Sequence, residues 1–334
     1  MDPLTQGLLG ASVGQAFYGR ALGRRAVVWG ALVGMAPDLD VLASPLRPGG
    51  DWLWHRGPTH ALLFGPLVGP AIGWLLWRKL GGRLSHWIGL CVAALFTHPL
   101  LDLFTSYGTQ LLWPFSRRRL ALDAIAIVDP AYSLILAAAL VLGLRWGAPT
   151  ASARRVAWVA LALSSAYVGV GLGIDARVEA VARRQLAAGG VAASRVSAFP
   201  TMLQLPLRRV VARSGDEVFV GWASGLSERP ISWEHFVAAS GPLVEAARQT
   251  PEVQLFEWFA RGEIAPRVEE RGAVVEFDDL RYGVPGRPRD GLWGVRVRLD
   301  AAGRPLGRAE RFARPPAAAS EVLGQLWHQT HGPS

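Results

Sequence analysis

Residues 86–104 read HWIGLCVAALFTHPLLDLF, an apolar run that contains His98 and Asp102. About 20 apolar residues are enough for a helix to cross the roughly 30 Å hydrocarbon core of a bilayer, so this run predicts a membrane-spanning helix. A charged side chain inside such a helix costs about 2.5–3.5 kcal/mol on insertion scales, and it therefore indicates a function. His98 and Asp102 are four residues apart, which places them on one helix face.

The rest of the first half of the chain repeats this apolar pattern. Charged residues make up 18% of the sequence, against roughly 25% in ordinary soluble domains, and the mean hydropathy is +0.23. Leu4–Tyr18 is shorter and rich in glycine, and we interpret it as a re-entrant or interfacial helix or as a sixth span. The fold class expected is a polytopic α-helical membrane domain of about five spans plus this N-terminal helix, followed by a small α+β extramembrane domain. The four further spans are Ala26–Leu42, Ala61–Trp77, Ile125–Leu144 and Val156–Ile174.

The charges divide the chain into residues 1–175 and residues 176–334. The first part has 14 Lys or Arg and 8 acidic residues, all Asp, whereas the second has 21 and 18 and contains every Glu. This mixed charge predicts a soluble α+β domain after the membrane domain. Its alternating segments predict strands, and two further stretches predict helices. The strands are Arg208–Arg213, Glu217–Trp222, Ala273–Phe277 and Leu292–Leu299, and the helices are Pro251–Arg261 and Ala319–His328.

The basic residues of the first part indicate how the chain is oriented in the membrane. The net charge of +9 does not form the single basic strip of a nucleic-acid-binding protein, and we expect no nucleic-acid partner. Short basic clusters precede or separate the apolar runs, and such clusters favour the cytoplasm. That orientation places residues after Asp175 in the periplasm. The clusters are Arg20, Arg24 and Arg25; Arg78, Lys79 and Arg83; and Arg145, Arg154 and Arg155.

His and Asp side chains recur near one predicted membrane face. Pro37 makes an extended or turn-like helix end, where alternate residues face the same way, and Pro58 suits the first turn of the next span. The single cysteine, Cys91, excludes a thiolate cluster, so the imidazole and carboxylate set favours zinc, manganese or iron, as one or two ions. Asp123 or Asp129 is then a candidate general base. The candidate ligands are Asp38, Asp40, His55, His60, His98 and Asp102.

Other interpretations of these residues stay open. A histidine in an apolar run is often a satisfied core residue, and an aspartate at a helix end is often a cap. A chain of Asp and His can also relay protons, as in an ion-coupled transporter, which is the alternative function. Clustering near one face favours a metal site. On this hypothesis a bound ion lowers the pKa of water toward about 7 and polarises a scissile bond, as in a metal-dependent hydrolase.

Arg117, Arg118 and Arg119 violate the charge rule, because they fall on the predicted periplasmic side. Guanidinium groups bind phosphate oxygens in bidentate fashion. We therefore predict that the triplet binds an anionic headgroup and that the substrate is a phosphoester of a lipid or amphiphile, with an amide bond as the weaker alternative. The triplet can instead anchor membrane lipids, or the predicted topology can be wrong by one span.

The order of several short motifs resembles bacterial inner-membrane, metal-dependent hydrolases of the YdjM type. These motifs cover most of residues 1–175. The resemblance implies an inner-membrane metal hydrolase with Asp38, Asp40, His55, His60, His98 and Asp102 in or beside the site, and it supplies no substrate. The motifs are MDPLTQG at 1–7, APDLD at 36–40, HRGPTH at 55–60, THPLLD at 97–102, DLFTSYGT at 102–109 and WPF at 113–115.

Overall fold

The structure is a computed structural model, and it describes residues 1–227, 229–269 and 273–314. The chain divides into two compact units. A helical unit comprises Met1–Gly171 together with Met202–Gln204, and a β-rich unit comprises Leu172–Thr201 and the chain from Leu205 onward. The division falls inside one long helix, α8 (Ala151–Ala188), four residues before the boundary expected from charge. The predicted helix at Ala319–His328 lies outside the described residues.

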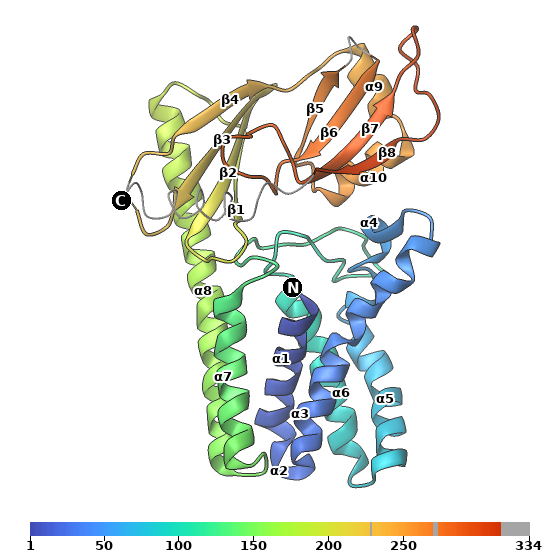
Figure 1. Cartoon of the computed structure of the whole chain (residues 1–334), viewed down its shortest axis with the longest axis vertical. Coiled ribbons are helices and arrows are strands. Elements are labelled where there is room, and N and C mark those ends of the chain that lie inside the picture. Colours follow the sequence, from blue (N-terminus) through green and yellow to red (C-terminus); the bar gives the residue numbers. More distant parts are fainter. Residues whose placement is uncertain (228, 270–272, 315–334) are drawn as a thin grey trace. The chain divides into compact units, whose positions relative to one another are not determined.

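The helical unit is a bundle in which α1 packs against α3, α6 and α7, and α6 packs against α3 and α5 (Figure 1). The crossing of α1 and α3 depends on glycine, because a Cβ atom added to Gly10 would lie 2.2 Å from the carbonyl oxygen of Gly30. The elements before α8 are α1 (Pro3–Val13), η1 (Gly14–Tyr18), α2 (Gly19–Leu22), α3 (Arg24–Met35), η2 (Ala36–Leu42), η3 (Ser44–Leu46), α4 (Gly50–Trp54), η4 (Pro58–His60), α5 (Phe64–Leu80), α6 (Leu84–Asp102) and α7 (Pro130–Trp146).

Two of the described helices, α6 and α8, are long and apolar enough to cross a membrane. A third span is present if α4–η4 and α5, which meet at a bend of 68°, count as one broken span. The apolar helix α7 has 17 residues. An apolar helical region with two to three candidate spans is therefore established, whereas the predicted count of five is not confirmed.

The β-rich unit contains two four-stranded antiparallel sheets, each a meander in sequence order. All four predicted strands are confirmed with ends shifted by at most two residues, and the predicted helix at 251–261 is α10. A tight turn between Ser214 and Glu217 closes the hairpin of β2 and β3. The elements are β1 (Arg195–Pro200), β2 (Leu207–Ser214), β3 (Glu217–Ser224), β4 (Trp233–Val237), α9 (Pro242–Arg248), α10 (Pro251–Phe259), β5 (Ile264–Glu269), β6 (Val274–Asp279), β7 (Trp293–Arg298) and β8 (Glu310–Ala313).

The segment between α6 and α7 folds back on itself and onto the residues that precede α5. Isolated bridges join Thr105 to Ile125 and Thr109 to Leu120. The amide of Gln110 donates to the carbonyl oxygen of Arg56, and the amide of Leu62 donates to that of Leu111. These bonds hold the loop that contains His55 and His60 against the end of α6.

Candidate metal centre

The residues of the candidate site come from three places that meet at one end of the helical bundle. Asp38 lies in η2, directly after the carboxyl end of α3, and His60 ends η4, just before α5 begins. His98 and Asp102 lie in the last turns of α6. Pro37 lies in the first turn of the 3-10 helix η2, where an extended or turn-like end was expected from sequence, and Pro58 starts η4. Because α5 runs antiparallel to α3 and α6, its first residues lie at the same end of the bundle as the last residues of α3 and α6. The three places therefore lie at one end of the helical bundle.

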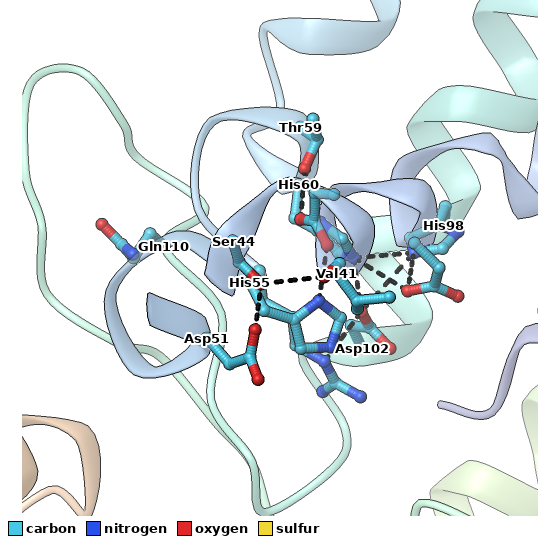
Figure 2. A network of polar contacts seen from close by, with 12 residues as sticks. Val41, Ser44, Asp51, His55, Thr59, His60, His98, Asp102 and Gln110 are labelled. Carbon is cyan, nitrogen blue, oxygen red and sulfur yellow. Dashed lines mark hydrogen bonds and ion pairs between the residues drawn. The ribbon is translucent and has the colours of Figure 1, made fainter. Parts of the chain in front are cut away.

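Four side-chain atoms converge here, each within 4.8 Å of the others: one from each of Asp38, His60, His98 and Asp102. His60, His98 and Asp102 point toward one another in Figure 2. The two histidine Nε2 atoms are 2.9 Å apart. His60 Nε2 lies 3.3 Å from Asp38 Oδ1 and 3.4 Å from Asp102 Oδ2, and the corresponding distances from His98 Nε2 are 3.5 and 3.6 Å.

These separations fit a single bound ion. Nitrogen and oxygen ligands at about 2.0–2.2 Å from one metal lie about 2.8–3.6 Å apart as tetrahedral or neighbouring octahedral ligands. Five of the six separations among the four atoms span 2.9 to 3.6 Å. All four side chains are buried, and Asp102 Oδ2, which faces the two histidines, accepts no hydrogen bond from the described residues. The donor set and its spacing therefore suit a divalent cation.

The hydrogen bonds on the far side of each imidazole fix where its proton lies. His98 Nδ1 is 2.6 Å from the carbonyl oxygen of Gly34, which can only accept, so Nδ1 carries the proton. Thr59 Oγ1 donates to Asp40 Oδ2 at 2.7 Å, so it acts as an acceptor for His60 Nδ1 at 3.0 Å. When both imidazoles are neutral, each presents an unprotonated Nε2, and the four converging atoms are then all acceptors. A doubly protonated His60 would place one proton among them.

Asp40 and His55 form a second group that shares His60. Asp40 Oδ1 lies 2.7 Å from His55 Nδ1, and Asp40 Oδ2 lies 3.3 Å from His60 Nδ1. Asp38 and Asp40 thus face opposite nitrogens of the same imidazole. A carboxylate on the outer nitrogen of a metal-bound histidine orients that ring and raises its basicity. The arrangement gives Asp40 this supporting position, with His55 behind it.

Asp102 is held from several sides. Gln6 Nε2 donates to Asp102 Oδ1 at 3.0 Å, and the amino group of Met1 contacts the same oxygen. Arg56 Nε lies 3.3 Å from Oδ2, the oxygen that faces the histidines. Neither Gln6 nor Arg56 was selected by sequence reasoning, although both occur in motifs quoted for the family resemblance. Their amide and guanidinium groups are not metal ligands, so ligand spacing gave no signal for them.

The other predicted site residues occupy different positions. Asp129 caps α7 through the amide of Tyr132 and accepts from the Tyr167 hydroxyl at 2.9 Å, and Asp123 is half-buried in a left-handed conformation at φ 51°. Neither belongs to the two groups that can hold a metal among the described residues. Arg117 and Arg118 are exposed, whereas Arg119 is buried.

Arg119 holds the loop structure together. Its guanidinium donates to the carbonyl oxygens of Trp52 and Gly108 at 3.0 and 2.7 Å, and it lies 5.1 Å from the centre of the Tyr107 ring. The prediction that all three arginines of the triplet face a substrate is therefore wrong for Arg119, because its donors are directed into the protein.

The fold and this site define a membrane protein with a buried His/Asp group that can bind a metal. The chain belongs to the YdjM inner membrane protein family, whose profile matches residues 1–178. The resemblance seen in the sequence is thereby confirmed, and an inner-membrane location agrees with both the family and the apolar helices.

Two relatives match parts of the chain. The uncharacterized protein YfhP of Bacillus subtilis (strain 168) is 33% identical over 129 residues, which are 37% of this chain and 38% of YfhP. The inner membrane protein YbcI of Escherichia coli (strain K12) is 32% identical over 122 residues, which are 35% of this chain and 69% of YbcI. Neither is named as an enzyme. No solved structure matches the chain with statistical significance.

Proposed function

We propose that this protein is a metal-dependent hydrolase whose single metal centre is held by Asp38, His60, His98 and Asp102. The observation that carries the proposal is the convergence of four buried ligand atoms. The Nδ1 atoms of His98 and His60, which face away from this group, are the protonated nitrogens of the two neutral rings. Burying acceptors against one another is costly unless a cation lies among them. Zinc, manganese and iron all suit imidazole and carboxylate ligands.

A bound divalent ion would supply an activated water near neutral pH and would polarise the scissile group. The chain's own residues prepare the site for this chemistry. The Gly34 carbonyl group fixes the tautomer of His98. The Thr59 hydroxyl, which donates to Asp40, fixes that of His60. Gln6 and Arg56 direct Asp102 Oδ2 toward the histidines. These supports keep the four ligands at their spacing without rearrangement.

The substrate that we propose is a phosphoester of a lipid or amphiphile at the outer face of the inner membrane. Support comes from the basic clusters, which favour a periplasmic β-rich unit and a topology of about five spans. The exposed Arg117 and Arg118 lie on the α6–α7 segment, which packs on the loop of His55 and His60. An anionic headgroup is complementary to these two arginines.

Position along the helices separates the hydrolase from the alternative of an ion-coupled transporter. A proton or ion pathway needs polar groups at successive depths. The acidic and histidine groups that can hold an ion among the described residues instead gather at one end of α3, α5 and α6. This placement favours the hydrolase.

Elemental analysis of the detergent-purified protein tests the metal centre. We expect about one equivalent of a transition metal per chain, and we expect His98→Ala to lose metal and phosphoesterase activity together. Ser85→Ala, on the first turn of the same helix, is the matched control and should keep both. Less than about half an equivalent in the parent, with unchanged thermal unfolding after chelation, would refute the proposal.

A further inference from the structure

Arg56 places a buried positive charge beside the four ligands. Its side chain is 2% exposed, and it follows His55 directly in the loop before η4. The Nε atom lies 3.3 Å from Asp102 Oδ2, and Nη1 donates to Thr105 Oγ1 at 2.6 Å. The guanidinium also lies 4.8 Å from the centre of the Tyr107 ring. Arg56 is thus fixed on three sides.

The backbone at Arg56 adopts a conformation that directs this side chain inward. Its φ of 58° is in the left-handed region, which residues other than glycine rarely adopt. Neighbouring hydrogen bonds hold the turn, because the Gly57 amide donates to the Trp54 carbonyl group and the Gln110 amide donates to that of Arg56. Strained residues of this kind are characteristic of functional sites, where the surrounding structure enforces them.

The contacts of Arg56 complement those of Gln6 on the same carboxylate. Gln6 donates to Asp102 Oδ1, and Arg56 lies against Oδ2, which faces His60 and His98. Thr105 also joins the Arg56 side chain to the backbone of Asp102. Its hydroxyl accepts from Arg56 and donates to the Asp102 carbonyl oxygen at 2.9 Å. A planar guanidinium can reach the carboxylate and the hydroxyl together, whereas a lysine ammonium reaches them only as a point charge.

We infer that Arg56 is a positioning residue of the metal centre, which fixes Asp102 so that Oδ2 faces the two histidines. This inference rests on the metal centre of the proposed function. Three carboxylates surround the site, those of Asp38, Asp40 and Asp102, and Arg56 offsets part of their mutual repulsion. Removing an outer partner of a metal ligand typically lowers metal affinity 10–100-fold.

Metal titration of the full-length protein in detergent tests the role of Arg56. The parent, Arg56→Met, Arg56→Lys and the exposed control Arg47→Met are titrated with Co²⁺ in competition with a chelating dye. The visible absorption of bound Co²⁺ reports the ligand geometry. We expect Arg56→Met to raise the Kd about 10–100-fold and to change the spectrum. Arg56→Lys should restore the affinity only in part, and Arg47→Met should match the parent.

The outcomes separate this inference from the proposed function. A parent that binds no Co²⁺ would overturn the metal centre and this inference with it. A parent that binds, with Arg56→Met equal in Kd and spectrum, would overturn the role of Arg56 and leave the centre intact. If Arg56→Met does not fold, Thr105→Val serves instead, because it removes the anchor of Nη1 and keeps the charge. An unchanged Kd and spectrum in Thr105→Val would likewise overturn the inference.

Discussion

Buried charge is handled differently in the two units of this protein. In the β-rich unit, buried carboxylates meet guanidinium groups: Asp279 lies 2.7 Å from Arg281, Asp278 lies 2.8 Å from Arg314, and Glu263 lies 2.8 Å from Arg195. In the helical unit, Asp102 also meets a guanidinium, that of Arg56 at 3.3 Å, but Asp38, His60, His98 and Asp102 in addition turn side-chain ligand atoms toward one another. These three carboxylates of the β-rich unit are paired with arginines, whereas the group in the helical unit is one that could hold a cation.

This difference distinguishes a structural charge network from a binding site. A buried ion pair whose hydrogen bonds are all made holds one arrangement of the chain and has no lone pair left for a further ligand. Glu276 illustrates this, because burial alone would raise its pKa, yet hydrogen bonds from Arg267 and Arg296 hold that pKa below its ordinary value. Acceptor atoms that face one another, as the ligand atoms of Asp38, His60, His98 and Asp102 do, are stabilised by a cation from outside the chain. The number of charged residues in a region therefore indicates a binding site less well than the ratio of hydrogen-bond donors to acceptors within the buried group.

The largest effect that we predict is on the β-rich unit. Asp279 accepts from the Arg281 side chain and from Trp293 Nε1 at 3.0 Å, so Asp279→Ala removes an acceptor from a fully buried guanidinium. Breaking such a buried pair costs about 3–5 kcal/mol. Hydrogen exchange of the full chain should show faster exchange of the β6 and β7 amides, while the metal content stays at the parental value.

Asp300→Ala is the matched control, because Asp300 pairs with the exposed Arg304 in a turn of the same unit. It should leave exchange in β6 and β7 unchanged. If Asp279→Ala also lost metal, the ion pairs of the β-rich unit would affect metal binding in the helical unit. The distinction drawn between the two units would then be wrong.

A smaller effect is expected inside the helical unit, where Asp40→Asn removes a charge that supports His60. Asp40 faces the outer nitrogen of that ring and also accepts from Thr59. Loss of such a support should weaken metal binding about 10–100-fold, which is about 1.4–2.7 kcal/mol, without abolishing it. Competitive metal titration measures this change, and Asp51→Asn, in the neighbouring helix α4, is the control.

The size of the loss identifies the role of Asp40. Complete loss of metal, as expected for Asp38→Asn, would make Asp40 a direct ligand, as the sequence predicts. An unchanged Kd would remove it from the centre.

Much of the fold follows from patterns that the sequence displays directly. The apolar run at 86–104 became α6 (Leu84–Asp102), and alternation predicted β2, β3, β6 and β7. The strand β8, which was not predicted, has only four residues and is too short to show a period of two. The lengths of the helices were predicted less well than their positions. The expected span Ala26–Leu42 is shorter in the structure, because α3 ends at Met35 and a 3-10 helix that contains Pro37 follows it.

The site could be predicted as a set of residues but not as an arrangement. His98 and Asp102 share a helix face through their spacing, and no sequence pattern states that His60 meets them from another element. Spacing also does not indicate that Asp38 and Asp40 face opposite nitrogens of one imidazole ring. Likewise, a run of three consecutive arginines does not indicate that Arg119 is the buried one.

The smallest effect for a single side chain concerns the exposed half of that arginine triplet. Arginines near an anionic lipid surface contribute about 1 kcal/mol each, which is about 5-fold in affinity. Arg117→Gln with Arg118→Gln should therefore weaken binding of a fluorescent anionic lysophospholipid in detergent about 25-fold, with metal content unchanged. Binding of a zwitterionic lysophospholipid should change little, because it carries no net charge for these side chains to attract.

Arg119→Gln gives the contrast, since Arg119 donates to the Trp52 and Gly108 carbonyl groups inside the protein. It should lower the thermal unfolding temperature, because the buried carbonyl oxygens lose their donors. The exposed pair should leave that temperature unchanged. If the Arg117/Arg118 double variant binds the anionic lipid as the parent does, charge on this loop does not recruit the substrate. The metal centre would still stand, because none of its ligands lies on the loop.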